Sequence, residues 1–273
     1  MNGIPEIPTE KEFERYQQLV YEKLGIRLIE KKRAMLGHRL YKRLSLLALS
    51  DFSQYYDFIR DSKNSDELRR ALEAITTNET FFFREIEHFR FLENHILAQI
   101  NAETGHMFKV WSAACSTGEE PYSIAMTLQA HCQVDWELLA TDVNASVIAT
   151  ARKGIYQDVR TELLSSDYRK LFCRRGVGEF KGYFRVVPEL REKIRFDVFN
   201  LLDDMSQFGT FDLIFLRNVL IYFDDESKQD ILTRIADVLN PRGYFFTGHA
   251  ESFHGLSTRF KSLRPSILQL KEQ

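Results

Sequence analysis

Apolar and polar positions recur with different periods in the two parts of this chain. Over residues 1 to about 85 the apolar residues return every three to four positions, which predicts helices throughout. From residue 108 onward, short apolar runs rich in β-forming residues alternate with segments of helical spacing. This alternation favours a largely parallel sheet covered by helices on both faces. We therefore assign 1–85 to an all-α domain with its linker and 86–273 to an α/β domain.

Four helices are predicted in the first part. The first begins at a capping box formed by Thr9 and Glu12 and ends at Gly25. The second covers roughly residues 30 to 47 and places its leucines on one face. Two further helices begin after Ser50 and Ser65.

The stretch from Phe108 to Asp142 predicts a βαβ unit. An apolar strand is followed by a turn of small residues at 116–118, a helix over 119–131 and a second strand that ends at Asp142. In such a unit a nucleotide-like ligand lies at the loop after the first strand, near the free N–H groups of the helix. An acid at the end of the second strand can accept hydrogen bonds from ribose hydroxyls.

This loop differs from a pyrophosphate-binding loop. It has one glycine, Gly118, and two carboxylates follow it, Glu119 and Glu120, which would repel phosphate. A cofactor with a ribose, an adenine and an ammonium group but no phosphate fits better, and S-adenosylmethionine has these parts. The alternative is a generic strand-to-helix turn whose two glutamates merely stabilise the helix N-terminus.

Strands and helices continue beyond Asp142. Residues 173–198 interrupt them with glycines and β-forming runs, which predicts a small antiparallel β insertion. The other predicted elements are helices over 145–153, 161–172 and 225–239, a strand over 211–216, a turn at 240–243, and strands over 244–247 and 266–270.

The segment that joins the two parts combines apolar and polar residues. Phe81 to Phe83 require burial, which we place at an interdomain seam, and Asn78, Thr80 and Arg84 bring polar groups to the same place. This combination indicates a site. The alternative is a capped helix in which Arg84 forms a surface pair with Glu85 or Glu87.

Composition excludes several other classes of protein. With 44% hydrophobic and 28% charged residues, the chain is ordinary for a globular protein, and no run approaches the roughly 20 apolar residues of a membrane span. A net charge of −2 gives no general attraction to nucleic acid. Three cysteines without metal-site spacing, and no recognisable signal peptide, favour a cytoplasmic protein without a metal. The cysteines are Cys115, Cys132 and Cys173.

The second helix is strongly basic. Its Lys32, Arg39, Lys42 and Arg43, with three further basic residues nearby, are opposed only by Glu30. One interpretation is a docking surface for an acidic partner, and the other is a solvated face.

Taken together, the motifs resemble those of the chemotaxis receptor methyltransferases, which esterify glutamates of bacterial chemoreceptors. The resemblance covers nearly the whole chain, and the order of its motifs is specific although each one is weak. It implies a class I S-adenosylmethionine-dependent methyltransferase with a Rossmann-like seven-stranded sheet, an N-terminal all-α domain and a small antiparallel β insertion. The motifs are TTNETFFFRE, SAACSTGEEPYSIAM, ATD, FNLL, FDLIFLRNVLIYFD and GHAESF.

The resemblance also implies roles for particular residues. Arg84 and Tyr222 would hold the acceptor at the reactive methyl, and the basic helix would bind the cytoplasmic helical region of a chemoreceptor. Whether Glu119 or Glu120 contacts the cofactor ammonium stays open. The residues implied to contact S-adenosylmethionine, or its product S-adenosylhomocysteine, are Asn78, Thr80, Arg84, Glu119 or Glu120, Asp142, Asn200, Leu201, Arg217 and Asn218.

Some family members bind a C-terminal receptor pentapeptide with the β insertion. The turn from Arg174 to Gly178 resembles theirs, and an arginine there could pair with a tail carboxylate. Glycines in such an insertion also serve simply to form tight turns. We expect a monomer that neither binds nucleic acid nor inserts into a membrane.

Two other functions remain open: an adaptor that binds the cofactor without turnover, and a small-molecule O-methyltransferase. The second would need a histidine base or a metal to deprotonate a hydroxyl. His249 and His254 are the histidines near a strand end in the second half, and we interpret them as structural. A base N-methyltransferase is disfavoured because none of the six prolines are adjacent, as its usual strand-end motif requires.

Overall fold

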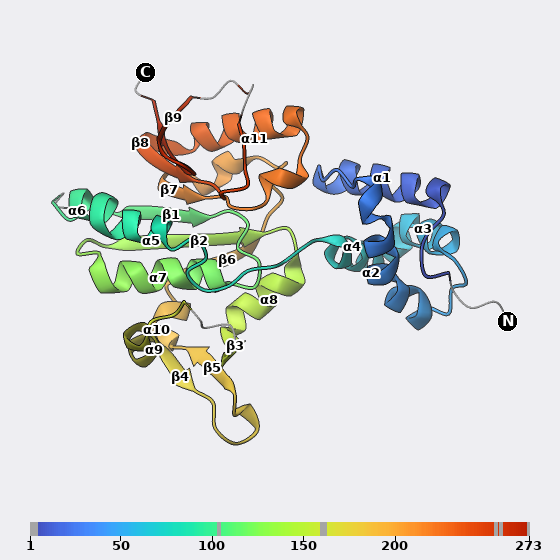
Figure 1. Cartoon of the computed structure of the whole chain (residues 1–273), viewed down its shortest axis with the longest axis horizontal. Coiled ribbons are helices and arrows are strands. Elements are labelled where there is room, and N and C mark those ends of the chain that lie inside the picture. Colours follow the sequence, from blue (N-terminus) through green and yellow to red (C-terminus); the bar gives the residue numbers. More distant parts are fainter. Residues whose placement is uncertain (1–4, 103–104, 159–162, 254–255, 257–258, 272–273) are drawn as a thin grey trace. The chain divides into compact units, whose positions relative to one another are not determined.

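The computed structural model describes residues 5–102, 105–158, 163–253, 256 and 259–271. The chain divides into two compact units, shown in Figure 1. The helical unit comprises Met1–Thr77 together with Tyr222–Asp224, and the α/β unit comprises Asn78–Ile221 and Asp225–Gln273. Among the described residues, no helix is both long and apolar enough to cross a bilayer.

The helical unit contains the four predicted helices. The Thr9 side chain accepts from Glu12 N and the Glu12 side chain bonds back to Thr9 N, which forms the predicted capping box. Gly25 ends the first helix in the left-handed conformation, with φ 67°. The helices are α1 (Glu10–Leu24), α2 (Arg33–Leu46), α3 (Phe52–Arg60) and α4 (Ser65–Ile75), with 3-10 turns η1 (Glu30–Lys32) and η2 (Ser62–Asn64).

The large sheet of the α/β unit has seven strands in the order β6-β2-β1-β7-β8-β10-β9. The first five are parallel to one another, whereas β10 pairs antiparallel with β8 and β9 pairs antiparallel with β10. The strands are β1 (Phe108–Ser112), β2 (Trp136–Asp142), β6 (Ile194–Val198), β7 (Phe211–Phe215), β8 (Leu239–Phe246), β9 (Phe260–Arg264) and β10 (Ile267–Leu270).

Two features at the end of this sheet differ from the sequence prediction. Residues 240–243 form no separate turn, because β8 runs from Leu239 to Phe246 with a shift of register where it pairs with β7. Strand β9 was not predicted, since four of its five residues are exposed and its sequence lacks the apolar pattern of a buried strand.

Helices cover the large sheet, and the apolar core includes the segment that follows Asn78. Phe82 and Phe83 are buried inside the α/β unit, where Phe82 contacts Tyr156 with ring centroids 5.0 Å apart. Phe81 stays 39% exposed. The predicted burial therefore applies to two of the three phenylalanines, and they belong to this core. The helical elements are α5 (Glu87–Phe91), η3 (Leu92–Ile96, a π-helical turn), α6 (Leu97–Ile100), α7 (Glu119–His131), α8 (Ala145–Lys153), α9 (Ser166–Phe172), α10 (Pro188–Arg191), η6 (Met205–Phe208), η7 (Leu220–Tyr222) and α11 (Asp225–Asp237).

The small antiparallel sheet has the order β3-β5-β4, with β3 (Ile155–Gln157), β4 (Cys173–Arg175) and β5 (Tyr183–Val186). Figure 1 shows it beside α9 and α10, with the loop that contains η5 (Gly178–Phe180) at its tip. It differs from the predicted range of 173–198, because β3 lies earlier in the chain and Ile194–Val198 forms β6 of the large sheet. A β-forming run predicts a strand but not its partner. Helix α9 starts at Ser166; residues 161 and 162 of the predicted helix lie outside the described residues.

Candidate functional site

The polar residues of interest gather at the carboxyl ends of β1, β2, β6 and β7. From β1 the chain proceeds to β2 and β6 on one side, and then returns to β7 on the other side of β1. Open α/β sheets bind ligands beyond the carboxyl ends of the strands, at the point where the strand order reverses in this way. The site therefore lies at a topological switch point within the α/β unit.

Asp142, at the end of β2, is bonded to the loop that follows β1. Its Oδ2 accepts from Ser116 N at 2.9 Å and its Oδ1 accepts from Asn144 N at 3.0 Å. Burial raises the pKa of this carboxyl, and the two backbone N–H groups offset part of that rise. Ser116 also donates its hydroxyl to the carbonyl of Asn78, 2.9 Å away. Asp142 thus fixes the conformation of the predicted cofactor loop through its carboxylate oxygens.

Gly118 is required by the packing of the loop. Its φ is +100°, and a Cβ at this position would lie 2.7 Å from Tyr156 Oη and 2.8 Å from Ala151 Cβ. Any other residue would be strained and would collide with the α8 region. The glycine therefore fits the tight turn from β1 into α7.

Glu119 and Glu120 have different surroundings. Glu119 is fully buried, and its Oε2 accepts from Thr117 Oγ1 at 2.6 Å. Glu120 keeps 12% of its side chain exposed; its Oε1 accepts from Ser112 Oγ at 2.7 Å and its Oε2 accepts from Arg217 at 3.0 Å. Burial raises the pKa of Glu120 against the opposing effect of Arg217. Of the two, Glu120 has the carboxylate that a ligand can reach.

Arg217, just beyond β7, connects several of the candidate residues. Its side chain is 2% exposed, and its guanidinium pairs with both Glu120 and Glu85, the latter at 3.2 Å. It also donates to the carbonyl of Arg84. The Arg84 side chain itself donates to the carbonyl of Glu79 at 3.1 Å and lies over the ring of Phe81. Glu85 is thus a partner of Arg217, a role that sequence reasoning missed because the two are far apart along the chain.

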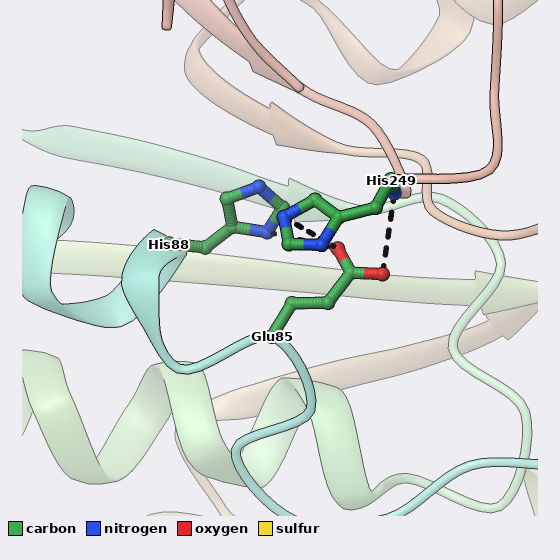
Figure 2. Close-up of side chains that lie close together, drawn as sticks. All are labelled: Glu85, His88 and His249. Atoms are coloured by element: carbon green, nitrogen blue, oxygen red, sulfur yellow. Dashed lines mark hydrogen bonds and ion pairs between the residues drawn. The ribbon is translucent and has the colours of Figure 1, made fainter. Parts of the chain in front are cut away.

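Figure 2 shows that Glu85 lies beside His88 and His249. Glu85 Oε2 is 3.5 Å from His88 Nδ1 and 3.9 Å from His249 Nε2. Burial and the nearby Arg217 charge lower the pKa of His88 to about 3, so this imidazole is neutral. Two histidines and a carboxylate can form a metal site, but the Arg217 guanidinium already supplies positive charge to the same Glu85 oxygen. We therefore interpret the cluster as part of an ion-pair network. His254 lies outside the described residues.

The remaining predicted residues lie in four places. Asn200 and Leu201 follow β6 and lie next to Asp142, because Phe199 N donates to the Asp142 carbonyl at 3.0 Å. Asn218 adopts a left-handed conformation with φ 58° immediately after Arg217. Thr80 is half-buried in the linker segment. Tyr222 belongs to the helical unit, where its carbonyl accepts from Arg27 N at 2.8 Å.

The four basic residues predicted to meet a partner differ from one another. The Arg39 guanidinium donates to the carbonyls of Ile75 and Thr76, the latter at 2.7 Å. Arg43 forms a two-pronged ion pair with the buried Glu67. Lys42 is exposed and Lys32 is half-buried. Two of the four charges therefore have structural partners inside the helical unit.

The polar groups of the site fit S-adenosylmethionine. Glu120 offers a carboxylate for an ammonium group, and Asp142 offers one for ribose hydroxyls. Arg217 Nε is buried and has no hydrogen-bond partner among the described residues, which leaves one donor at this site unsatisfied.

Comparisons with known proteins identify the family of this chain. Residues 78–267 match the family description "CheR methyltransferase, SAM binding domain", and residues 11–76 match "CheR methyltransferase, all-alpha domain". The chain is 41% identical over 261 residues to the chemotaxis protein methyltransferase of Salmonella typhimurium, covering 94% of this chain and 88% of that protein. It is 40% identical over 256 residues to the chemotaxis protein methyltransferase of Escherichia coli, with coverages of 92% and 88%. Chemotaxis protein methyltransferase 2 of Pseudomonas aeruginosa is 38% identical over 263 residues, with coverages of 95% and 92%.

Proposed function

Because the chain belongs to the CheR methyltransferase family, we propose that it transfers a methyl group from S-adenosylmethionine to glutamate side chains of bacterial chemoreceptors. The observation that supports this most directly is the buried Asp142 at the end of β2, beside a loop that carries Glu120 and no basic residue for a phosphate. Methylation of receptor glutamates would tune adaptation in chemotactic signalling.

In this proposal each polar group of the site has a defined task. Asp142 accepts hydrogen bonds from the ribose, and Glu120 faces the ammonium group of the methionyl part. Asn200 and Leu201 lie beside the adenine. Asn78, Thr80, Arg217 and Asn218 complete the binding site, and Glu119 stays a structural partner of Thr117.

The transfer needs no catalytic base. When bound, S-adenosylmethionine supplies a methyl group on a positively charged sulfur. The acceptor glutamate, with an ordinary pKa near 4.3, is already an anion at pH 7, so no proton has to be removed. The protein has to align that carboxylate and exclude water from it. We assign the alignment to the Arg84 guanidinium and the Tyr222 hydroxyl, both of which can donate to a carboxylate.

Tyr222→Phe tests this assignment. We expect the variant to bind S-adenosylhomocysteine as the parent does and to turn over about tenfold more slowly, because a hydrogen bond to a charged group contributes roughly 1.5–3 kcal/mol. The measurement is transfer of labelled methyl to membranes that contain chemoreceptors, with release of the label as methanol in alkali to identify an ester.

Tyr244→Phe is the matched control, because its hydroxyl bonds to Gln99 at 3.1 Å and has no proposed role. Turnover of Tyr222→Phe within a factor of two of the parent would contradict the alignment role. Cofactor binding without any labelling by the parent would indicate an adaptor, and labelling of small hydroxylated molecules instead of receptors would indicate an O-methyltransferase of that class.

We also propose that Lys32 and Lys42 of the helical unit face the acidic helical region of the receptor. Lys42 is exposed, and among the described residues no ion pair of either lysine was found. Arg39 and Arg43 hold α2, which carries this surface, in place. Arg39 bonds to residues 75–77 and Arg43 bonds to Glu67 of α4.

The small sheet offers a second contact with the receptor. Among the described residues, the outer strands β3 and β4 each pair on one side only, and an extended peptide can add to such a free edge through main-chain hydrogen bonds. Arg174 and Arg175 on β4 are exposed and can pair with a terminal carboxylate. Val177 and Phe180 at the tip are 80% and 59% exposed and offer apolar contacts for side chains.

A C-terminal receptor pentapeptide is therefore expected to bind the isolated protein, and fluorescence anisotropy of the labelled peptide would measure its affinity. Capping the peptide carboxylate as an amide should weaken binding by about tenfold, since a charge-assisted hydrogen bond is lost. If no receptor tail of the host binds, with S-adenosylhomocysteine present, the small sheet is a structural flap only.

We propose that the protein works in the cytoplasm as a monomer. Light scattering of the purified protein should then give a mass of about 32.1 kDa, that of one chain. A measured mass of two chains at micromolar concentration would contradict the proposed monomeric state.

A further inference from the structure

Glu251 makes a set of contacts that the proposed roles do not use. Its Oε1 accepts two backbone N–H groups, from Val219 at 2.9 Å and from Leu220 at 2.7 Å. Its other carboxylate oxygen accepts from Gly248 N. One side chain therefore joins the segment after β8 to the segment after β7.

The segment after β7 is one that needs such support. It begins with the buried Arg217 and continues with Asn218 in the left-handed conformation, which costs an asparagine less than most residues but still strains the backbone. Gly248 packs against this turn so closely that a Cβ there would lie 2.8 Å from Asn218 N. Leu220 then starts η7, the 3-10 turn that ends at Tyr222.

We propose that Glu251 is a positioning residue for methyl transfer, which rests on the function proposed above. Its carboxylate caps the first N–H groups of η7 and holds the strained turn at Asn218 in one conformation. The chain on one side of this cap carries Arg217 and Asn218 toward the cofactor. On the other side it leads to Tyr222, which we assign to the acceptor.

The carboxylate is better suited to this task than an amide. Both Glu251 oxygens accept, one from Val219 and Leu220 and the other from Gly248. A glutamine has one oxygen and one NH₂ group, so in either orientation an NH₂ would face a backbone N–H. Glu251→Gln therefore removes part of the cap while it keeps the size of the side chain.

The experiment compares Glu251→Gln and Glu251→Asp with the parent in the receptor methylation assay. We expect Glu251→Gln to lower kcat about tenfold, to leave KM for S-adenosylmethionine within about threefold and to leave the thermal midpoint within a few degrees. Glu251→Asp should retain more activity than Glu251→Gln, because it keeps two accepting oxygens. A purely structural residue would lower the thermal midpoint and kcat together and would show no such split.

Asp61→Asn is the matched control, because Asp61 caps the 3-10 turn η2 by accepting from Lys63 N at 2.9 Å and lies in neither proposed binding surface. It should leave kcat unchanged. Amide exchange of residues 217–224, followed by mass spectrometry, is the second measurement and is independent of turnover. Glu251→Gln should speed exchange there at least tenfold.

The outcomes separate this inference from the proposed function. A parent that methylates receptors, with a Glu251→Gln variant of equal kcat, overturns the positioning role alone. A parent without receptor methylation overturns the proposed function, and the exchange measurement then still decides whether Glu251 holds the turn. Unchanged exchange in Glu251→Gln would overturn the inference in either case.

Discussion

Replacing Asp142 with asparagine is expected to weaken binding of S-adenosylhomocysteine by about 1.5–3 kcal/mol, roughly 10- to 150-fold in Kd. The carboxylate accepts from Ser116 N and Asn144 N in this structure and is placed to accept from ribose hydroxyls as well. An asparagine has one acceptor oxygen where the aspartate has two, so the loop and the ribose would compete for it. Isothermal titration with S-adenosylhomocysteine measures the change.

The control is Glu137→Gln, which makes the same change of carboxylate to amide near the other end of β2, where the side chain is exposed. It should leave the affinity unchanged. Equal affinities for the Asp142→Asn variant and the parent would remove Asp142 from the cofactor site.

The pH dependence of cofactor binding follows from the same groups. Burial raises the pKa of Asp142 and of Glu120 above their ordinary values, and both are expected to bind the cofactor as anions. Affinity should therefore fall as the pH decreases through these raised pKa values. Asp142→Asn should show a weaker pH dependence than the parent, with the remainder due to Glu120.

Arg43→Ala is expected to destabilise the helical unit by about 1.5–3 kcal/mol, because it removes the two-pronged bond and leaves the buried Glu67 carboxylate with Arg70, 3.7 Å away, as its remaining cation. Arg43 Nε donates to Glu67 Oε1 at 2.8 Å, and Tyr55 Oη donates to the same oxygen at 2.8 Å. Glu67 is 6% exposed, so its carboxylate is stabilised by these partners and little by water. Chemical denaturation followed by circular dichroism would measure the loss.

This ion pair also predicts how stability depends on pH. Burial acts to raise the pKa of Glu67, but the bonds from Arg43 and Tyr55 outweigh it and lower the pKa below the ordinary value. A lowered folded-state pKa stabilises the fold above the pKa of the unfolded chain, and this contribution is lost as the pH falls through the folded-state value. The parent should therefore lose more stability in acid than Arg43→Ala does, because the variant keeps only the effects of Tyr55 and Arg70 on Glu67.

Lys42 provides the comparison that separates stability from docking. It is adjacent to Arg43 but exposed, so Lys42→Glu should leave the unfolding free energy within about 0.5 kcal/mol of the parent. If this helix meets an acidic receptor surface, Lys42→Glu should raise KM for receptor, and rising salt should reduce the difference by screening. Equal KM for variant and parent at low salt would leave α2 as a solvated face.

Local sequence signals determined much of this protein. Thr9 with Glu12, and Gly25, set the limits of the first helix because capping chemistry involves residues only a few positions apart. The apolar run before Gly118, the helix after it and the acid at Asp142 likewise predicted the βαβ unit, because side-chain periodicity and turn chemistry are local properties. The ordered motifs then indicated the family and its cofactor.

The tertiary structure decided which side chains meet. Arg43 looked like one more basic residue of a surface helix, and only packing against α4 brings it to Glu67, 24 positions away. Arg217 and Glu85 are 132 positions apart, and Glu251 reaches residues about 30 positions before it. A β-forming run does not name its neighbour either, so β6 was assigned to the small sheet although it pairs with β2. Periodicity reports which face of an element is buried, whereas the partners of a buried charge are set by the path of the whole chain.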